Sequence, residues 1–389
     1  MSVWGKLANR FEGKENEKHR LLALDGGGIR GILSLEVLAR MEEMLAQATG
    51  TGEAFRLCHF FDYVAGTSTG AIIAAGLARG MSAAELLSFY RETGPAMFDK
   101  QFILRRWYAL YKSEPLKKEL QRTFGAETRL TPDDLQCLLL AVLRNRTTDS
   151  PWPVSSNPQA KYNEVCRTDC NLRLPLWKIV RASTAAPVFF PPEVIQCDPN
   201  DRLKTFVFVD GGLTPYNNPA FLLYRMTTQP GYRLNWADGE QKLLIVSIGT
   251  GAAAVVENSA TDPDRGLIGN VSALPGALMY AAMVDQDTTC RLVGRCVHGP
   301  VLDREIGDMI PRDADGNPFP LTRDLGRKFL YARYNADLSR NGLDEMGLRD
   351  IRPEHVQKLD SIDHIDDLRR VGRRVAEAIN LEHFGPFVS

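Results

Sequence analysis

The first residue suited to chemistry is Ser68, in the run Gly66-Thr67-Ser68-Thr69-Gly70, which matches the pattern G-x-S-x-G. Between a strand and a helix this pattern forms a sharp turn that exposes the serine hydroxyl, and Gly66 and Gly70 relieve crowding around it. The N-terminus of the following helix directs amide groups toward a developing negative charge. The spacing therefore predicts a serine nucleophile for acyl transfer. A glycine-rich turn with an ordinary capping serine has the same composition.

A second motif would supply the complementary hydrogen-bond donors. It reads Asp25-Gly26-Gly27-Gly28-Ile29-Arg30-Gly31. Consecutive glycines leave backbone N–H groups open to an anion. Acyl transfer needs such donors for its oxyanion, and removal of one costs about 10²–10³ in rate. We predict an oxyanion hole at Gly26, Gly27 and Gly28. Arg30 would add positive charge or bind a phosphate head group; the alternative is an ordinary surface arginine.

The same glycines also satisfy G-x-G-x-x-G, the dinucleotide-binding fingerprint, through Gly26, Gly28 and Gly31. That fingerprint requires an acidic residue at the end of the next strand. The next predicted strand ends instead at the turn that contains Ser68, and Asp25 is an unfavourable neighbour for a pyrophosphate. A non-enzymatic nucleotide-binding module at Gly26–Gly31 is therefore the alternative and not the main hypothesis.

The third motif, Asp210-Gly211-Gly212, follows another apolar run and is suited to accept a proton. Its alternative is a turn-forming Asp-Gly pair. Histidines after Asp210 are the candidates for a conventional triad: His298, His355, His364 and His383. None follows a predicted strand in a glycine loop, as the order Ser-Asp-His requires. We therefore predict a Ser68–Asp210 dyad, with burial raising the carboxyl pKa toward neutrality. A Ser-His-Asp esterase or peptidase that uses His298 is the rival.

Apolar runs before each motif predict the strands that position it. The predicted strands are Leu21–Leu24, Phe60–Ala65, Phe206–Val209 and Leu243–Ile248. The predicted helices are Ile32–Gln47, Ala71–Arg79 and a closing amphipathic helix at Ser361–Leu381, with core helices over Gly70–Ala78 and Leu135–Leu143 and a loop at Ser150–Pro158. Alternating strands and helices favour a mainly parallel α/β sheet with chemistry at its carboxyl ends.

Composition narrows the class of protein further. The chain has 389 residues, with 47 Lys plus Arg against 48 Asp plus Glu, so a nucleic-acid binder is not expected. No apolar run approaches the length that spans a bilayer, and residues 1–20 lack the apolar middle of a secretory signal. The seven cysteines include no C-x-x-C pair, which favours free thiols and a cytoplasmic location over a metal site.

The three motifs, in this order and at these strand ends, resemble those of the patatin-like phospholipases, and Arg181–Pro192 resembles a further segment of that family. The resemblance covers about residues 20–251. It implies a three-layer α/β/α fold, a Ser68–Asp210 dyad, an oxyanion segment containing Gly26, Gly27, Gly28 and Arg30, and no metal or cofactor. Gly66, Gly70, Gly211 and Gly212 support the motifs. We expect an N-terminal arm (1–19), loosely held, and one catalytic domain (20–389), with residues 252–389 packed on the core.

The resemblance extends to bacterial members, some of which are similar to anti-phage effectors that cyclic di- or trinucleotides activate. It implies a lipid acyl hydrolase acting on membrane phospholipid at the inner face of the membrane. Phe329, Tyr331 and Arg333 alternate on one predicted strand and would suit base stacking, although core aromatics explain them too. Residues 102–112 suit an interfacial helix, a lid or a packed helix. Charge reversal at Arg105 and Arg106 is expected to weaken liposome binding while small soluble esters are still cleaved.

Overall fold

A computed structural model describes residues 2–98, 114–187, 190–252 and 267–388. Its sheet has the strand order β5-β6-β3-β2-β1-β7-β9-β8, with β4 paired to β3. The strands are β1 His19–Leu24, β2 Tyr63–Thr67, β3 Leu138–Asn145, β4 Ser150–Ser155, β5 Glu193–Gln196, β6 Thr205–Asp210, β7 Leu243–Ile248, β8 Arg295–His298 and β9 Leu330–Tyr334. Strands β3, β2, β1, β7, β9 and β8 run parallel, whereas β4, β5 and β6 join through antiparallel pairs.

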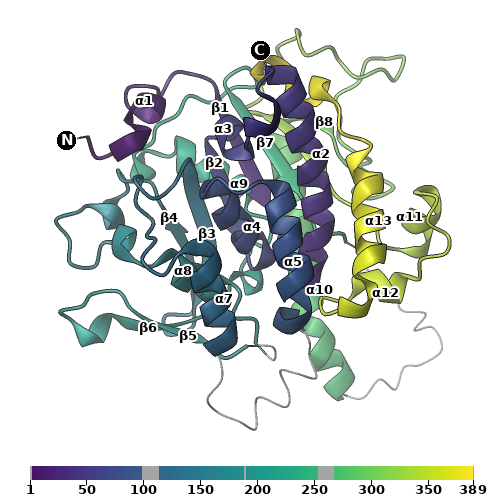
Figure 1. Cartoon of the computed structure of the whole chain (residues 1–389). Coiled ribbons are helices and arrows are strands. Elements are labelled where there is room, and N and C mark those ends of the chain that lie inside the picture. Colours follow the sequence, from purple (N-terminus) through teal and green to yellow (C-terminus); the bar gives the residue numbers. More distant parts are fainter. Residues whose placement is uncertain (1, 99–113, 188–189, 253–266, 389) are drawn as a thin grey trace.

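Helices cover both faces of the sheet (Figure 1). They are α1 Ala8–Phe11, α2 Gly31–Thr49, α3 Leu57–Phe60, α4 Thr69–Ala78, α5 Ala83–Phe98, α7 Glu114–Phe124, α8 Leu176–Ser183, α9 Ala220–Thr228, α10 Leu267–Val293, α11 Arg340–Glu345, α12 Pro353–Gln357 and α13 Ile365–Ala376. Figure 1 shows α2, α5 and α13 side by side on one face, and α9 and α10 pack on the other. This is the expected three-layer α/β/α architecture with a mainly parallel sheet.

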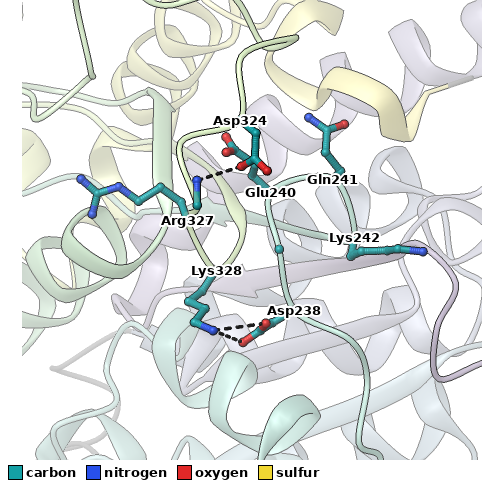
Figure 2. A pocket seen from close by; sticks show the side chains of 9 residues that line it. Asp238, Glu240, Gln241, Lys242, Asp324, Arg327 and Lys328 are labelled. Carbon is teal, nitrogen blue, oxygen red and sulfur yellow. Dashed lines mark hydrogen bonds and ion pairs between the residues drawn. The ribbon is translucent and has the colours of Figure 1, made fainter.

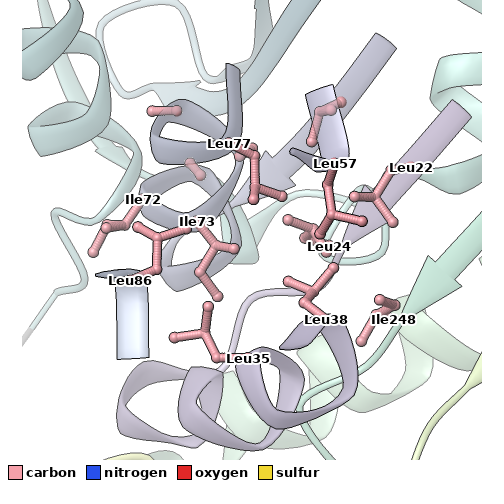
Figure 3. Close-up of a cluster of buried hydrophobic side chains, with 14 of the residues drawn as sticks. Leu22, Leu24, Leu35, Leu38, Leu57, Ile72, Ile73, Leu77, Leu86 and Ile248 are labelled. Atoms are coloured by element: carbon pink, nitrogen blue, oxygen red, sulfur yellow. The ribbon is translucent and has the colours of Figure 1, made fainter. Parts of the chain in front are cut away.

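Alternation along the strands builds two cores, because successive side chains point to opposite faces. In β1, Leu22 and Leu24 pack against α2 and α4, while Leu21 and Ala23 face the other core. Figure 3 shows the first core, where leucines and isoleucines of α2, α4 and α5 interleave over β1 and β7. Burial on both faces leaves the central strands rigid supports for the loops at their ends.

The edge of β3 explains how Ser68 and Asp210 meet although 142 residues separate them. Strand β4 occupies one edge of β3. On the other edge β2 ends at Thr67, opposite Val142, and β6 ends at Asp210, opposite Leu143. Because β2 runs parallel to β3 and β6 runs antiparallel, their carboxyl ends meet head to head. The residue that follows Thr67 therefore lies next to Asp210.

Two sequence-based assignments around β3 are wrong. The apolar run Leu135–Leu143 was expected to be a helix, but most of it forms the central strand β3, whose side chains are buried on both faces. A short apolar run does not distinguish a buried strand from a buried helix. Residues 150–158 were expected to be a loop, but Ser150–Ser155 forms β4. Its prolines are tolerated because β4 pairs with β3 alone.

The N-terminal segment and the C-terminal extension both pack into the fold. The expectation of a loosely held arm is wrong for residues 2–19, because Trp4, Leu7 and Phe11 are buried in the core on the α9 face. The extension adds β8 and β9 to the same sheet, and α13, the shorter form of the expected closing helix, packs along α2. Within the described ranges no helix is both long and apolar enough to cross a bilayer.

Candidate active site

Ser68 lies at a sharp turn between β2 and α4. Its backbone has φ 54° and ψ −123°, a conformation that a non-glycine residue adopts only when its surroundings enforce it. The flanking glycines allow this turn, since a Cβ on Gly66 would lie 2.0 Å from the carbonyl oxygen of Gly70. A Cβ on Gly70 would lie 2.3 Å from the carbonyl oxygen of Leu24, at the end of β1. The predicted elbow is present, and it is packed against the central strand.

The hydroxyl of Ser68 donates a hydrogen bond to Asp210 Oδ2 at 2.6 Å. The other carboxylate oxygen, Oδ1, accepts the N–H of Gly212 at 2.7 Å. Both Ser68 and Asp210 are buried, at 9% and 5% exposure. Burial raises the pKa of Asp210 to about 6, against the opposing effect of the two hydrogen bonds that it accepts. The carboxylate is therefore ionised at neutral pH and is a stronger base than an exposed aspartate.

The glycine loop follows β1 and lies beside Ser68. Gly26 donates its N–H to the carbonyl of Asn217 at 3.1 Å, so that amide is already occupied. In the described chain the N–H groups of Gly27 and Gly28 make no hydrogen bond. The N–H of Thr69, the residue after Ser68, makes none either. Three donors from two strand–helix turns are thus left for an anion, and Thr69 is the residue that supplies the helix N-terminal amide expected after Ser68.

Arg30 is anchored to main-chain oxygens behind the glycine loop. Its Nε donates to Gly27 O at 3.4 Å and its Nη1 to Gln357 O at 3.2 Å. Burial lowers its pKa to about 10, which leaves the guanidinium charged at neutral pH. The turn is fixed from the same side by Leu359, whose carbonyl accepts the N–H of Ile29 at 3.0 Å. Residues of the C-terminal extension therefore support the loop, and no short motif of the sequence had indicated them.

Three polar side chains complete the surroundings of Ser68, and none of them belongs to a motif that predicts such a role. Ser183, at the end of α8, accepts the N–H of Ser68 at 3.0 Å and donates to Val142 O at 2.7 Å. Thr250 donates to Gly26 O at 3.0 Å. Asn217 lies over Gly26, and its buried Oδ1 has no hydrogen-bond partner in the described chain.

Strand β9 connects the glycine loop to α10 through Arg333. Its guanidinium donates to both oxygens of Asp25, at 3.0 and 2.5 Å, and to Ser247 Oγ at 2.6 Å. Nε of Arg333 lies 3.7 Å from Asp287 Oδ2 of α10, and Asp287 Oδ1 accepts a hydrogen bond from the Tyr331 hydroxyl at 3.0 Å. Phe329, Tyr331 and Arg333 share one face, as expected. However, all are at most 1% exposed, so they cannot stack on a nucleotide base.

All six histidines lie in the described residues, and none hydrogen-bonds to Ser68 or Asp210. His298, the candidate for a triad, stacks on His383 with ring centroids 4.6 Å apart, and burial lowers its pKa to about 4. The candidate membrane segment 102–112 lies outside the described residues.

A polar pocket of about 340 Å³ lies where β7 and β9 begin, at the ends of the strands away from Ser68 (Figure 2). It is bordered by the residues that precede β7 and β9, whereas the turns that contain Ser68 and Gly26–Gly28 follow the carboxyl ends of β2 and β1. Several of its charged groups already have partners: Lys328 lies 3.3 Å from Asp238, and Glu240 lies 3.0 Å from Arg295. We assign this pocket no part in the chemistry at Ser68.

The fold and the site together define a class: an α/β/α protein with a hydrogen-bonded serine–aspartate pair where two strand ends meet. The family model described as "Patatin-like phospholipase" matches residues 22–224, more than half of the chain. The chain therefore belongs to the patatin-like phospholipase family.

Among known proteins, the chain is 33% identical to the cGAMP-activated phospholipase of Vibrio cholerae over 52% of this chain and 56% of that protein. It is 31% identical to the cGAMP-activated phospholipase of Escherichia coli over 52% and 54% of the two chains. The mouse 85/88 kDa calcium-independent phospholipase A2 is 30% identical over 67% of this chain and 30% of that protein. The chain thus spans just over half the length of the two bacterial relatives.

Proposed function

We propose that the protein is a lipid acyl hydrolase of the phospholipase A or lysophospholipase type that cleaves carboxylic esters of membrane phospholipids. The observation that carries the proposal is the 2.6 Å hydrogen bond from Ser68 Oγ to the buried Asp210 carboxylate. Membership of the patatin-like phospholipase family supports the choice of substrate. No metal or organic cofactor is part of this mechanism.

In the proposed first step, Ser68 Oγ attacks the ester carbonyl carbon and its proton passes to Asp210 Oδ2. The N–H groups of Gly27 and Gly28 stabilise the resulting oxyanion, with Thr69 N–H as a third donor and the charge of Arg30 behind the loop. The Gly26 N–H is not assigned to the oxyanion because it donates to a carbonyl. Collapse of the intermediate breaks the bond to the glycerol oxygen, which takes the proton from Asp210.

The second step hydrolyses the acyl-enzyme. Asp210, ionised again, accepts a proton from water, and the hydroxide attacks the Ser68 ester. The intermediate expels Ser68 Oγ, which recovers the proton from Asp210, and the fatty acid leaves. A carboxylate with a pKa of about 6 suits both transfers, because at neutral pH it is ionised yet remains basic.

Fatty-acid release from phospholipid vesicles by the purified chain tests this proposal. We expect Ser68→Ala and Asp210→Asn each to lower release by about 10³-fold or more, as loss of a group essential to acyl transfer does. Ser88→Ala, at an exposed serine of α5, is the matched control and should be fully active. His298→Gln should also be active. Release that persists in Ser68→Ala would refute Ser68 as the nucleophile, and absence of release by the folded parent would favour the non-enzymatic nucleotide-binding alternative. Loss of release in His298→Gln, with Asp210→Asn still active, would favour a conventional triad.

We further propose that a cyclic di- or trinucleotide activates the enzyme, which would act in the cytoplasm on the inner face of the membrane in anti-phage defence. Two relatives that carry the name cGAMP-activated phospholipase support this, at 33% and 31% identity. A constitutively active phospholipase would damage the membrane of its own cell, so a ligand-dependent switch is expected. The vesicle assay with and without a panel of cyclic oligonucleotides tests it, and equal release in both arms would refute activation.

A further inference from the structure

The C-terminal extension brings two histidines and a carboxylate together away from Ser68. They are His355 of α12, His364 at the end of the short helix Ile362–His364, and Asp367 in the first turn of α13. One ligand-forming atom from each lies within 4.8 Å of the other two. In the described residues this is the one group of three or more His, Cys, Asp or Glu side chains with such spacing.

The geometry of this cluster is that of ligands converging on one point. Nδ1 of His355 lies 3.8 Å from Asp367 Oδ2, and Nδ1 of His364 lies 3.5 Å from the same oxygen. Ligands at about 2.0–2.2 Å from a tetrahedral zinc ion lie about 3.3–3.5 Å apart. One pair therefore already has the required separation, and the other needs a shift of a few tenths of an ångström.

The chemical composition of the cluster favours a transition metal. Two imidazoles and one carboxylate suit zinc and related divalent ions, whereas calcium and magnesium prefer oxygen ligands alone. Arg370 lies 3.5 Å from Asp367 Oδ1, so it orients the carboxylate and leaves Oδ2 directed toward the histidines. The three side chains are 25–34% exposed, which gives an ion access and leaves room for a water as fourth ligand.

We propose that His355, His364 and Asp367 form a binding site for a divalent transition-metal ion such as Zn²⁺. The two imidazole rings are stacked at 3.7 Å and inclined by 10°. Because each nitrogen lone pair lies in its ring plane, coordination requires the rings to turn apart. Their partial exposure permits that movement. His364 directly precedes α13 and Asp367 lies in its first turn, three residues later, while His355 joins them from α12.

The proposed site lies next to residues that contact the glycine loop. The metal would connect α12 to α13, on either side of the segment 357–359. That segment supplies the two carbonyls, Gln357 O and Leu359 O, that accept from Arg30 and Ile29. A Cβ on Gly28 would lie 2.3 Å from Leu359 O, so the contact is close. Bound metal is therefore expected to restrain the turn that contains the free Gly27 and Gly28 amides.

Direct zinc binding to the full-length, tag-free chain tests the site independently of ester hydrolysis. A Cys166→Ser background removes the exposed thiol as a competing ligand. Titration against a chromophoric chelator should show one zinc ion per chain, with affinity about tenfold or more weaker in His355→Ala and His364→Ala. Asp366→Asn, whose carboxylate is 95% exposed, is the matched control for Asp367→Asn and should bind normally.

A cobalt(II) titration gives a second readout, because coordination by two imidazoles in a low-coordinate site produces visible absorption bands. Circular dichroism confirms that each variant is folded. Zinc bound equally by the parent and by both histidine variants, or absence of saturable binding by the folded parent, overturns the site. Zinc that binds at the site without slowing hydrogen exchange of the Ile29 amide overturns the link to the glycine loop. Failure of ester hydrolysis would leave both results unchanged, since neither measures turnover.

Discussion

Replacement of Asp210 by asparagine is expected to abolish hydrolysis and yet to stabilise the fold at neutral pH. Burial raises the pKa of this carboxyl group to about 6 in the folded protein, compared with about 3.9 for aspartate in an unfolded chain. The folded state therefore binds the proton more tightly. The stability that this group contributes is fully present below about pH 4 and is lost as the pH rises through 6.

The size of the effect follows from the two pKa values. A difference of about 2 units at ~1.36 kcal/mol each costs the folded protein about 3 kcal/mol above pH 7 and about half of that at pH 5. Asparagine is neutral at every pH and avoids this cost. Its Oδ1 can accept from Gly212 N–H and its Nδ2 can donate to Ser68 Oγ. The second amide hydrogen needs a new acceptor, which subtracts about 1 kcal/mol. The expected net gain is about 2 kcal/mol at pH 8 and about 0.5 kcal/mol at pH 5.

Urea unfolding at pH 8 and pH 5 measures this difference. Ser68→Ala is the matched inactive control, because it removes a hydrogen bond to the buried carboxylate and should lower stability by about 1.5–3 kcal/mol at pH 8. The two substitutions thus abolish the same activity but shift the free energy of unfolding in opposite directions. An Asp210→Asn protein that is less stable than the parent at pH 8, or equally shifted at both pH values, would refute the raised pKa.

The charge of Asp210, the Arg333–Asp25 pair and the packing of Gly70 can each be tested separately. The kcat/KM for a soluble ester should fall about tenfold per pH unit below pH 6, because Asp210 must be ionised; a flat profile between pH 5 and 8 would contradict its role as base. Arg333→Met should lower the free energy of unfolding in urea by about 3–5 kcal/mol, because it leaves Asp25 buried and unpaired. Adding Asp25→Asn should recover part of this loss, and a double variant no more stable than Arg333→Met would argue against the pair. Gly70→Ala should lower the free energy of unfolding by about 1–3 kcal/mol or more, because its Cβ would meet backbone oxygens. Gly276→Ala, in open space on α10, should raise it by roughly 0.5–1 kcal/mol, so equal melting temperatures of the two variants would contradict the packing of the elbow.

The sequence was sufficient to predict the α/β architecture and the strand-end motifs because local patterns encode them. Ser68 and Gly66 lie within five residues of one another, and the apolar spacing in α2 is regular over its length. The direction of β6 was not predictable in this way. The apolar run before Asp210 predicts one more strand of a mainly parallel sheet, whereas β6 runs antiparallel to β3. Pairing direction depends on contacts between distant segments, and no local pattern records it.

The supporting residues were missed for the same reason. Ser183 and Leu359 contact the elbow and the glycine loop from segments far along the chain, through hydrogen bonds that involve a single hydroxyl or a main-chain carbonyl. Every residue type supplies a main-chain carbonyl, so an acceptor of this kind cannot be recognised from the sequence. Arg333 alternates with aromatic residues, but that pattern also fits a core strand, and its partner Asp25 lies 308 residues away.

The glycine loop is held by residues that are translated long after it. Chains are made from the N-terminus, so β1, β2 and the elbow emerge first, while Arg333 and Leu359 follow Asp210 by 123 and 149 residues. Until those residues leave the ribosome, Asp25 has no guanidinium partner and the Ile29 amide has no acceptor. A nascent or truncated chain therefore contains the serine and the aspartate without an ordered anion-binding turn. The cell is exposed to the assembled site only after synthesis has passed Leu359.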